Sequence, residues 1–169
     1  MPHDFDPAYR DHDHAACIEE AMAAARQLCA AAGARLTPLR EKVLLLIWQS
    51  HQPLGAYTIL DQLGQTESGG RPAPPTVYRA LEFLLELGLV HRLNSLNAYV
   101  GCSDPRHAHA GQFLICRQCN TAMELDNDAI DQALDQAARA AGFSAEHAAV
   151  EILGLCPNCQ QAEKGTARD

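Results

Sequence analysis

Cysteine and histidine residues crowd one short stretch of the chain, residues 101–119, which reads GCSDPRHAHAGQFLICRQC. Two of its cysteines form a Cys-x-x-Cys pair, and a second such pair follows after 36 intervening residues. Each pair can form a tight turn that directs two thiolates at one point, and two turns complete a closed tetrahedral zinc site. A redox pair is the alternative, but it would be a single motif that opens a helix. We therefore predict a structural zinc site made by Cys116, Cys119, Cys156 and Cys159.

A second group of metal-binding residue types remains when these four cysteines are set aside. The short alternating runs 89–93 and 98–102 predict a β-hairpin with a four-residue turn, in which residue 93 pairs with residue 98. That register places His91 and Cys102 diagonally on one face, with their α-carbons about 7–8 Å apart. The two side chains can then share a metal ion, whereas a turn of odd length would separate them.

Further donors for this second site are His107, His109 and Glu124. Glu124 lies in the alternating run TAMEL, where its carboxylate should point away from Met123 and Leu125. A set of two histidines, one cysteine and one glutamate suits zinc better than iron or manganese. From the residues alone, ordinary roles stay open: a surface histidine on a strand, a buried thiol and a solvated carboxylate.

The elements that must position these residues begin with a run of helices. Alanine-rich residues 16–32 predict a first helix. Thr37 is a suitable N-cap for a second helix, which is apolar on nearly all sides as far as Trp48 and should be buried. Two shorter helices, one ending near Leu63 and one over residues 76–87, precede the hairpin. This order of helices and hairpin is typical of a winged helix-turn-helix.

The rest of the chain has the pattern of a small α/β unit. Two strands flank the first Cys-x-x-Cys turn, an amphipathic helix follows, and a third strand leads into the second pair. A unit this small is marginally stable alone and needs a metal, a dimer partner or both. The predicted fold is therefore α+β: an N-terminal winged helix-turn-helix and a C-terminal α/β unit, which the four-cysteine zinc site holds together. The family resemblance given below implies that the first is a DNA-binding domain and the second a dimerisation domain. The expected boundaries are a disordered tail at 1–15, the winged-helix domain at 16–95, a hinge with metal ligands at 96–110, the dimerisation domain at 111–162 and a tail at 163–169.

Composition narrows the class of protein and the place of any DNA contact. The longest apolar run, VLLLIW, is far shorter than the roughly 20 residues that span a bilayer, and the acidic N-terminus lacks the apolar segment of a signal peptide, so we expect a cytoplasmic protein. In that reducing compartment, seven cysteines favour thiols and metal ligands over disulfides. The net charge of −8 disfavours nucleic acid, but residues 33–93 carry six basic and five acidic side chains. Only this third of the chain can present a basic face to DNA.

The helix predicted at 76–87 carries the best candidate for reading bases. Arg79 projects roughly opposite the apolar stripe of Val77, Leu81 and Leu84. An arginine on the outer face of a recognition helix can bond both O6 and N7 of guanine. The alternative from the residues alone is an i, i+3 ion pair with Glu82, which contributes only a few tenths of a kcal/mol.

Several motifs resemble one known family. LTPLREKVL, PPTVYRALEFLLELGLVHRL, YVGC, the His-x-His motif and the paired Cys-x-x-Cys motifs are similar to those of the ferric-uptake-regulator superfamily, specifically its zinc-uptake-regulator branch. The resemblance covers about residues 20–160. It implies a homodimeric, non-enzymatic repressor that binds palindromic operator DNA when a regulatory zinc is bound near the hinge, and that controls zinc uptake genes. It also implies two zinc ions per chain, one structural and one regulatory.

The resemblance also assigns residues to these roles. His109 is preferred to His107 because it stands seven residues before Cys116, as in that branch, and the His-His-Asp-His cluster of the iron-sensing branch is missing here. The implied regulatory zinc ligands are His91, Cys102, His109 and Glu124. The implied DNA-contacting residues are Tyr57, Thr76, Tyr78 and Arg79, with Arg35, Arg40 and Lys42 as weaker candidates for phosphate contacts.

Three other functions are weighed against this one. A metal-dependent enzyme is disfavoured because a fourth ligand closes the metal site and leaves no nucleophile or general base. An iron or peroxide sensor of the same superfamily would bind iron, and a zinc-stabilised interaction module would not bind DNA. The segment HDFDPAYRDHDH at the N-terminus holds three histidines and four aspartates, and we expect it to be solvated rather than a metal site. His51 has no identifiable partner in the sequence.

Overall fold

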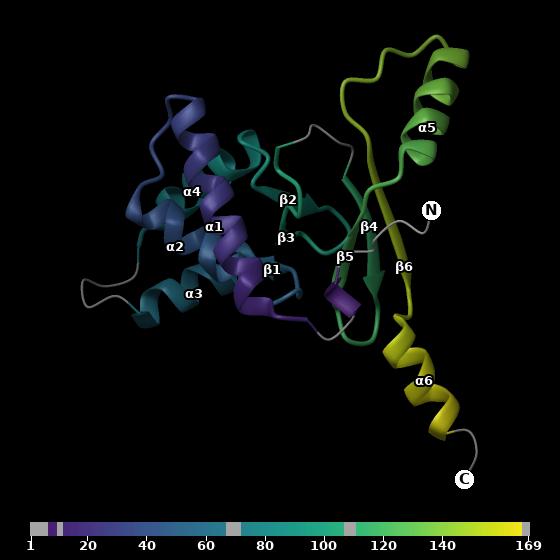
Figure 1. Cartoon of the computed structure of the whole chain (residues 1–169), viewed down its shortest axis with the longest axis horizontal. Helices are drawn as coiled ribbons and strands as arrows, with labels where there is room; N and C mark the ends of the chain where they lie inside the picture. Colours follow the sequence, from purple (N-terminus) through teal and green to yellow (C-terminus); the bar gives the residue numbers. More distant parts are fainter. Residues whose placement is uncertain (1–6, 10–11, 67–71, 107–110, 167–169) are drawn as a thin grey trace. The chain divides into compact units, whose positions relative to one another are not determined.

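The structure is a computed structural model that describes residues 7–9, 12–66, 72–106 and 111–166. The described residues form two compact units, one within Asp11–Ala108 and the other within His109–Asp169 together with Met1–Arg10 (Figure 1). The first unit is mainly helical with a small sheet. The second has a three-stranded sheet, with one helix before its last strand in the chain and one helix after it. The fold class is therefore α+β, as predicted. Within the described ranges, no helix combines the length and apolar character that a membrane crossing requires.

Four helices build the first unit, and the sequence supplies a start signal for three of them. Asp13 accepts hydrogen bonds from the backbone N–H groups of Ala15 and Ala16, and Thr37 accepts one from the N–H of Arg40, so both act as N-caps. The fourth helix begins with a proline, whose fixed φ suits the first helical position. The helices are α1 (His14–Ala31), α2 (Pro38–Trp48), α3 (Ala56–Thr66) and α4 (Pro74–Glu86).

Helix α2 lies at the centre of this unit and packs against α1, α3, α4 and the wing strand β3 (Ala98–Gly101) (Figure 1). Val43, Leu44 and Ile47 are almost completely buried, and Leu45 is 38 % exposed. The expected burial of α2 is thus correct for most of its surface, and the side that carries Leu45 is exposed to solvent. The guanidinium of Arg40 lies 3.5 Å from the centroid of the Phe83 ring, so a cation–π contact also joins α2 to α4.

The wing is a three-stranded antiparallel sheet in the order β1 (Leu54–Gly55), β3 (Ala98–Gly101) and β2 (Val90–Leu93). The register pairs Leu93 with Ala98 and His91 with Val100, which confirms the predicted four-residue turn. Asn97 closes this turn at φ +47°, a conformation that asparagine tolerates better than most residues. Residues 98–101, which also fall in the predicted hinge at 96–110, form β3, the central strand of the wing.

Gly101 is a position where the wing packs too closely for a side chain. A Cβ atom there would lie 2.5 Å from Nε1 of Trp48 on α2, well inside van der Waals contact. Gly101→Ala should therefore push the indole aside and lower the free energy of unfolding by about 1–3 kcal/mol. Trp48 is the only tryptophan, so urea unfolding followed by its fluorescence measures the effect directly. Gly55→Ala is the matched control, since its Cβ would meet only the carbonyl oxygen of Asn97 at 4.0 Å, and an equal loss in both variants would contradict the prediction.

The second unit contains the predicted order of strand, strand, helix and strand. Strand β4 (Gly111–Cys116) is central, with β5 (Ala122–Leu125) antiparallel on one side and β6 (Ala149–Gly154) parallel on the other. Helix α5 (Asp128–Ala140) lies between β5 and β6 in the chain.

Helix α5 carries an apolar face that this single chain does not cover. None of its residues is buried, and Figure 1 shows it standing away from the faces of its own sheet. Its start is held in place by the buried side chain of Gln112, which donates hydrogen bonds to the carbonyl of Asn127 (3.1 Å) and to Asp131 (2.6 Å). The helix is thus positioned at one end and available for further packing along its length.

The two predicted tails are wrong in their described parts. Residues Pro7–Tyr9 form a 3-10 turn, η1, and the Tyr9 hydroxyl lies within hydrogen-bond distance of the carbonyl oxygens of Leu114 (2.8 Å) and Thr121 (3.0 Å). Helix α1 begins at His14, because Asp13 caps it before the alanine-rich run. At the other end, α6 (Pro157–Thr166) continues beyond residue 163. Acidic composition suggested disorder at 1–15, but one aromatic side chain and one capping aspartate are enough to order the described residues there.

Candidate metal centres and nucleic-acid interface

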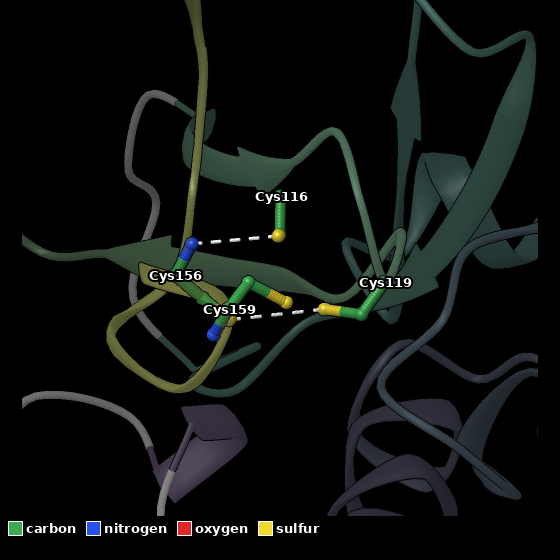
Figure 2. A group of neighbouring side chains, drawn as sticks. All are labelled: Cys116, Cys119, Cys156 and Cys159. Carbon is green, nitrogen blue, oxygen red and sulfur yellow. Dashed lines mark hydrogen bonds between the residues drawn. The ribbon is translucent and has the colours of Figure 1, made fainter. Parts of the chain in front are cut away.

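The four cysteines of the two Cys-x-x-Cys pairs meet in the second unit (Figure 2). Cys116 ends β4, Cys119 follows on the turn towards β5, and Cys156 and Cys159 lie at the start of α6. Asn120 completes the first turn at φ +58° and donates its backbone N–H to the carbonyl of Cys116 (2.9 Å). All four sulfur atoms lie within 4.8 Å of one another.

The spacing of these sulfur atoms fits a tetrahedral metal centre. Cys119 Sγ and Cys156 Sγ are 3.8 Å apart, whereas a disulfide bond needs about 2.05 Å. A tetrahedral zinc ion with Zn–S bonds of about 2.3 Å separates its sulfur ligands by about 3.8 Å. None of the four forms a disulfide, and Cys116 and Cys156 are buried while Cys119 and Cys159 are half-buried, so the donor set and geometry match a closed structural zinc site.

Two thiols of this cluster have pKa values that are shifted in opposite directions. Burial raises the pKa of Cys116, but backbone N–H donors from Cys119, Cys156 and Gln118 outweigh it and lower that pKa to about 6. Hydrogen bonding to Cys156, followed by burial and the other two thiols, raises the pKa of Cys159 to about 12. Thiolates this close repel one another, so without a cation Cys159 keeps its proton at neutral pH. A divalent metal ion is the charge that lets all four ligands deprotonate together.

In the first unit, the wing brings His91 and Cys102 together. Cys102 follows β3 directly, is 2 % exposed, and its backbone N–H donates to the carbonyl of Leu89 (3.1 Å). A ring nitrogen of His91 and the Cys102 sulfur lie within 4.8 Å of each other. The predicted hairpin register is the reason, since His91 and Cys102 fall on one face of the sheet in that register and on opposite faces after a slip of one residue.

The other predicted ligands belong to other parts of the sequence. Glu124 is in the second unit, on β5 opposite Phe113, and only 7 % of it is exposed. Such a carboxylate requires hydrogen bonds or a cation to remain charged away from water. His107 and His109 lie outside the described residues.

The side chains of all four predicted DNA-contacting residues are exposed to solvent. The apolar stripe of α4 is buried, and Thr76 and Arg79 on the same helix are exposed. Tyr57 on α3 is 75 % exposed and Tyr78 is 39 % exposed, and both line one shallow hollow with Arg92. No ion pair joins Arg79 to Glu82 in the described chain, so the alternative role predicted for this arginine is not observed. Its guanidinium is therefore available to a ligand.

One cluster was missed at the sequence level. The side chains of His12, His14 and His51 meet in the first unit, although the sequence places His51 far from the other two. The density of histidine before α1 was the only signal, and it does not reveal which later residue packs beside it.

Comparison with known proteins decides which family this arrangement represents. The ferric uptake regulator family matches residues 31–153. The chain is 38 % identical over 148 residues to the zinc uptake regulation protein of Escherichia coli (strain K12). The aligned segment covers 86 % of this chain and 84 % of that protein. The chain belongs to the ferric uptake regulator family. Its members are transcription regulators, which overturns the metal-dependent enzyme as an alternative.

Solved structures of the family agree with this assignment. A zinc uptake regulator complexed with zinc and DNA has a TM-score of 0.81 at 36 % identity, over 87 % of this chain and 97 % of that one. The holo form of XcZur has a TM-score of 0.76 at 40 % identity, over 83 % and 96 % of the two chains. The family match at residues 31–153 includes helices α2 to α4, the wing strands and the first Cys-x-x-Cys pair.

Proposed function

We propose that this chain is a zinc-responsive homodimeric repressor that binds palindromic operator DNA and controls zinc uptake genes. One observation carries the proposal. The wing of the winged-helix unit brings the imidazole of His91 and the thiol of Cys102 within 4.8 Å of each other. This pair lies in a chain similar to a zinc uptake regulation protein and to a zinc uptake regulator complexed with zinc and DNA.

The regulatory zinc ligands in this proposal are His91, Cys102, His109 and Glu124. A thiolate with two imidazoles and one carboxylate is a borderline-soft set, and it favours zinc over the harder iron(II) and manganese(II) ions. Together with the four-cysteine site, this gives two zinc ions per chain. The second ion would be the exchangeable one, because the four-thiolate site is closed and stabilises the fold.

The regulatory effect follows from where the ligands lie in the chain. His91 and Cys102 belong to the DNA-binding unit, and Glu124 belongs to the four-cysteine unit. A ligand set shared by two units favours the arrangement in which all donors reach one point, and so shifts the population towards it. Couplings of this kind are typically about 1–3 kcal/mol, which corresponds to roughly a 5–150-fold change in DNA affinity per site.

The dimer in this proposal forms through the second unit. The side chains of Leu134, Phe143, Ile152 and Leu153 are between 36 % and 68 % exposed, on or beside α5 and on the edge strand β6. An apolar helix face and a sheet edge on one unit are features that a second copy can cover. A two-fold dimer would present two α4 helices to successive major grooves, which matches a palindromic operator.

Zinc-dependent DNA binding is the direct test of this function. The full chain, titrated with a fluorescent AT-rich palindromic duplex, should bind at least 5-fold more tightly with saturating zinc than after mild chelation. Plasma mass spectrometry should find two zinc ions per chain before chelation and one afterwards. One bound iron per chain would instead indicate the iron- or peroxide-sensing alternative, and absence of DNA binding with zinc would indicate an interaction module.

Arg79→Ala is the matched variant in that experiment. Loss of a bidentate contact to guanine should weaken binding of the zinc-loaded protein by about 1–3 kcal/mol, or roughly 5–150-fold. Because Arg79 is exposed, its zinc content and thermal stability should equal those of the wild type. Arg139→Ala, on α5 in the other unit, is the control for removing one positive charge. Equal losses in the two variants would show that general charge, not Arg79, supports binding.

A further inference from the structure

The described part of the first unit contains a histidine cluster that the proposed function does not use. His14 is the first residue of α1, His12 stands two residues before it, and His51 lies in the connection between α2 and β1. The ring centroids are 4.8 Å apart for His14 and His51, 5.0 Å for His12 and His51, and 5.6 Å for His12 and His14. All three belong to the same compact unit, so their proximity is a property of its fold.

The ring nitrogens in this cluster point towards one another. Nε2 of His12 and Nε2 of His51 are 3.0 Å apart, and one nitrogen from each of the three rings lies within 4.8 Å of the others. Two imidazole ligands of a tetrahedral ion with bonds of about 2.0–2.1 Å have nitrogens about 3.3 Å apart. Both ring nitrogens of His14 are buried, and neither has a hydrogen-bond partner in the described chain. Buried imidazole nitrogens normally have such a partner, so this ring has unused bonding capacity.

The charge state of His51 suits metal binding. Burial lowers the pKa of His51 to about 4, and the neighbouring charges of His14 and His12 contribute to the same shift. At neutral pH the His51 ring is therefore uncharged and keeps a lone pair for a cation. Asp13 is the nearest carboxylate in sequence, but it caps α1 by accepting from Ala15 and Ala16. Its negative charge also offsets the unfavourable effect of the helix N-terminus on a nearby cation.

We propose that His12, His14 and His51 form a third metal site, which binds a borderline divalent transition-metal ion through three imidazoles. Imidazole ligands suit zinc, copper and nickel, and three protein ligands leave a fourth position open to water. The site would connect the start of α1 to the end of α2 inside the DNA-binding unit, independently of the regulatory ligands. It also contains no thiolate, which distinguishes it chemically from the four-cysteine site and from the site at Cys102.

Cobalt binding to the full chain with its structural zinc retained tests this site. Equilibrium dialysis should give one fewer Co²⁺ per chain for His14→Gln and for His51→Gln than for the wild type. His147→Gln is the control, because this histidine is exposed and lies in the other unit, and it should bind as the wild type does. The loss of one Co²⁺ per chain should also occur when Cys102→Ser is added to each protein. That result would show that the ion is not bound at the regulatory zinc site.

Spectroscopy separates a histidine site from an indirect effect. The Co²⁺ spectrum of His51→Gln should have weaker d–d absorption than that of the wild type. Its sulfur-to-metal charge-transfer bands should be unchanged, since no cysteine is a ligand of this site. In the wild type, Zn²⁺ should shift the ring ¹⁵N resonances of His12, His14 and His51 together, which needs no variant to fold. Equal cobalt counts in all variants, or ring resonances that do not respond to Zn²⁺, would show that these histidines only pack and hydrogen-bond with one another.

Discussion

Cys102→Ser should abolish the zinc dependence of DNA binding while the chain stays folded. A serine hydroxyl is a poor zinc ligand at neutral pH, so the regulatory set loses its only thiolate and much of its preference for zinc. DNA affinity measured by fluorescence anisotropy should then be the same with zinc and after chelation, at the level of chelated wild type. The zinc count should fall by one ion per chain, because the four-cysteine site is in the other unit and keeps its own ion.

Two further variants make this result specific. Cys17→Ser removes a half-exposed thiol from α1 and should keep the full zinc response. Glu124→Gln keeps the shape of the side chain but removes the charge, and it should reproduce the effect of Cys102→Ser from the second unit. If Cys102→Ser responds to zinc as the wild type does, the regulatory ligands are not those proposed. If only Glu124→Gln keeps the response, the carboxylate is not a ligand.

The parts of the fold that sequence alone predicted are those fixed by local chemistry. Thr37 caps α2, and the buried stripes of α3 and α4 follow helical spacing. The pairing of Leu93 with Ala98 follows from the length of the hairpin turn, and this one register decides whether His91 and Cys102 meet. The meeting of the two Cys-x-x-Cys pairs was predictable because each motif is a preformed half of a known geometry.

The parts that sequence did not predict depend on contacts between distant residues. Tyr9 reaches carbonyl oxygens on β4 and beside β5, more than 100 positions away, and no local pattern encodes that pairing. The cluster at His12, His14 and His51 has the same origin, since the fold of α1 against α2 brings separate segments together. In both cases a segment with the composition of a disordered tail is ordered by a few side chains with specific partners.

Cys156→Ser should unfold the second unit and leave the first unit native. Structural zinc of this kind contributes on the order of 10 kcal/mol or more to folding, which exceeds the stability of most small domains. The core of the first unit contains no residue of the second, so it should survive. Hydrogen exchange should show the amides of β4, β5 and β6 unprotected, while the fluorescence of Trp48 stays that of the folded protein.

The size of this loss distinguishes metal binding from ordinary packing. Cys29→Ser is the matched control, because Cys29 is as buried as Cys156 but has no partner cysteine near it in the described chain. Placing a hydroxyl there should lower the free energy of unfolding by about 1–3 kcal/mol and leave both zinc ions bound. A Cys156→Ser protein that keeps its zinc and its protected β4 amides would mean that these four thiols are not the zinc ligands. Loss of zinc with β4 still protected would mean instead that the sheet is stable without the metal, and that a second copy packed on α5 and β6 supplies the stability.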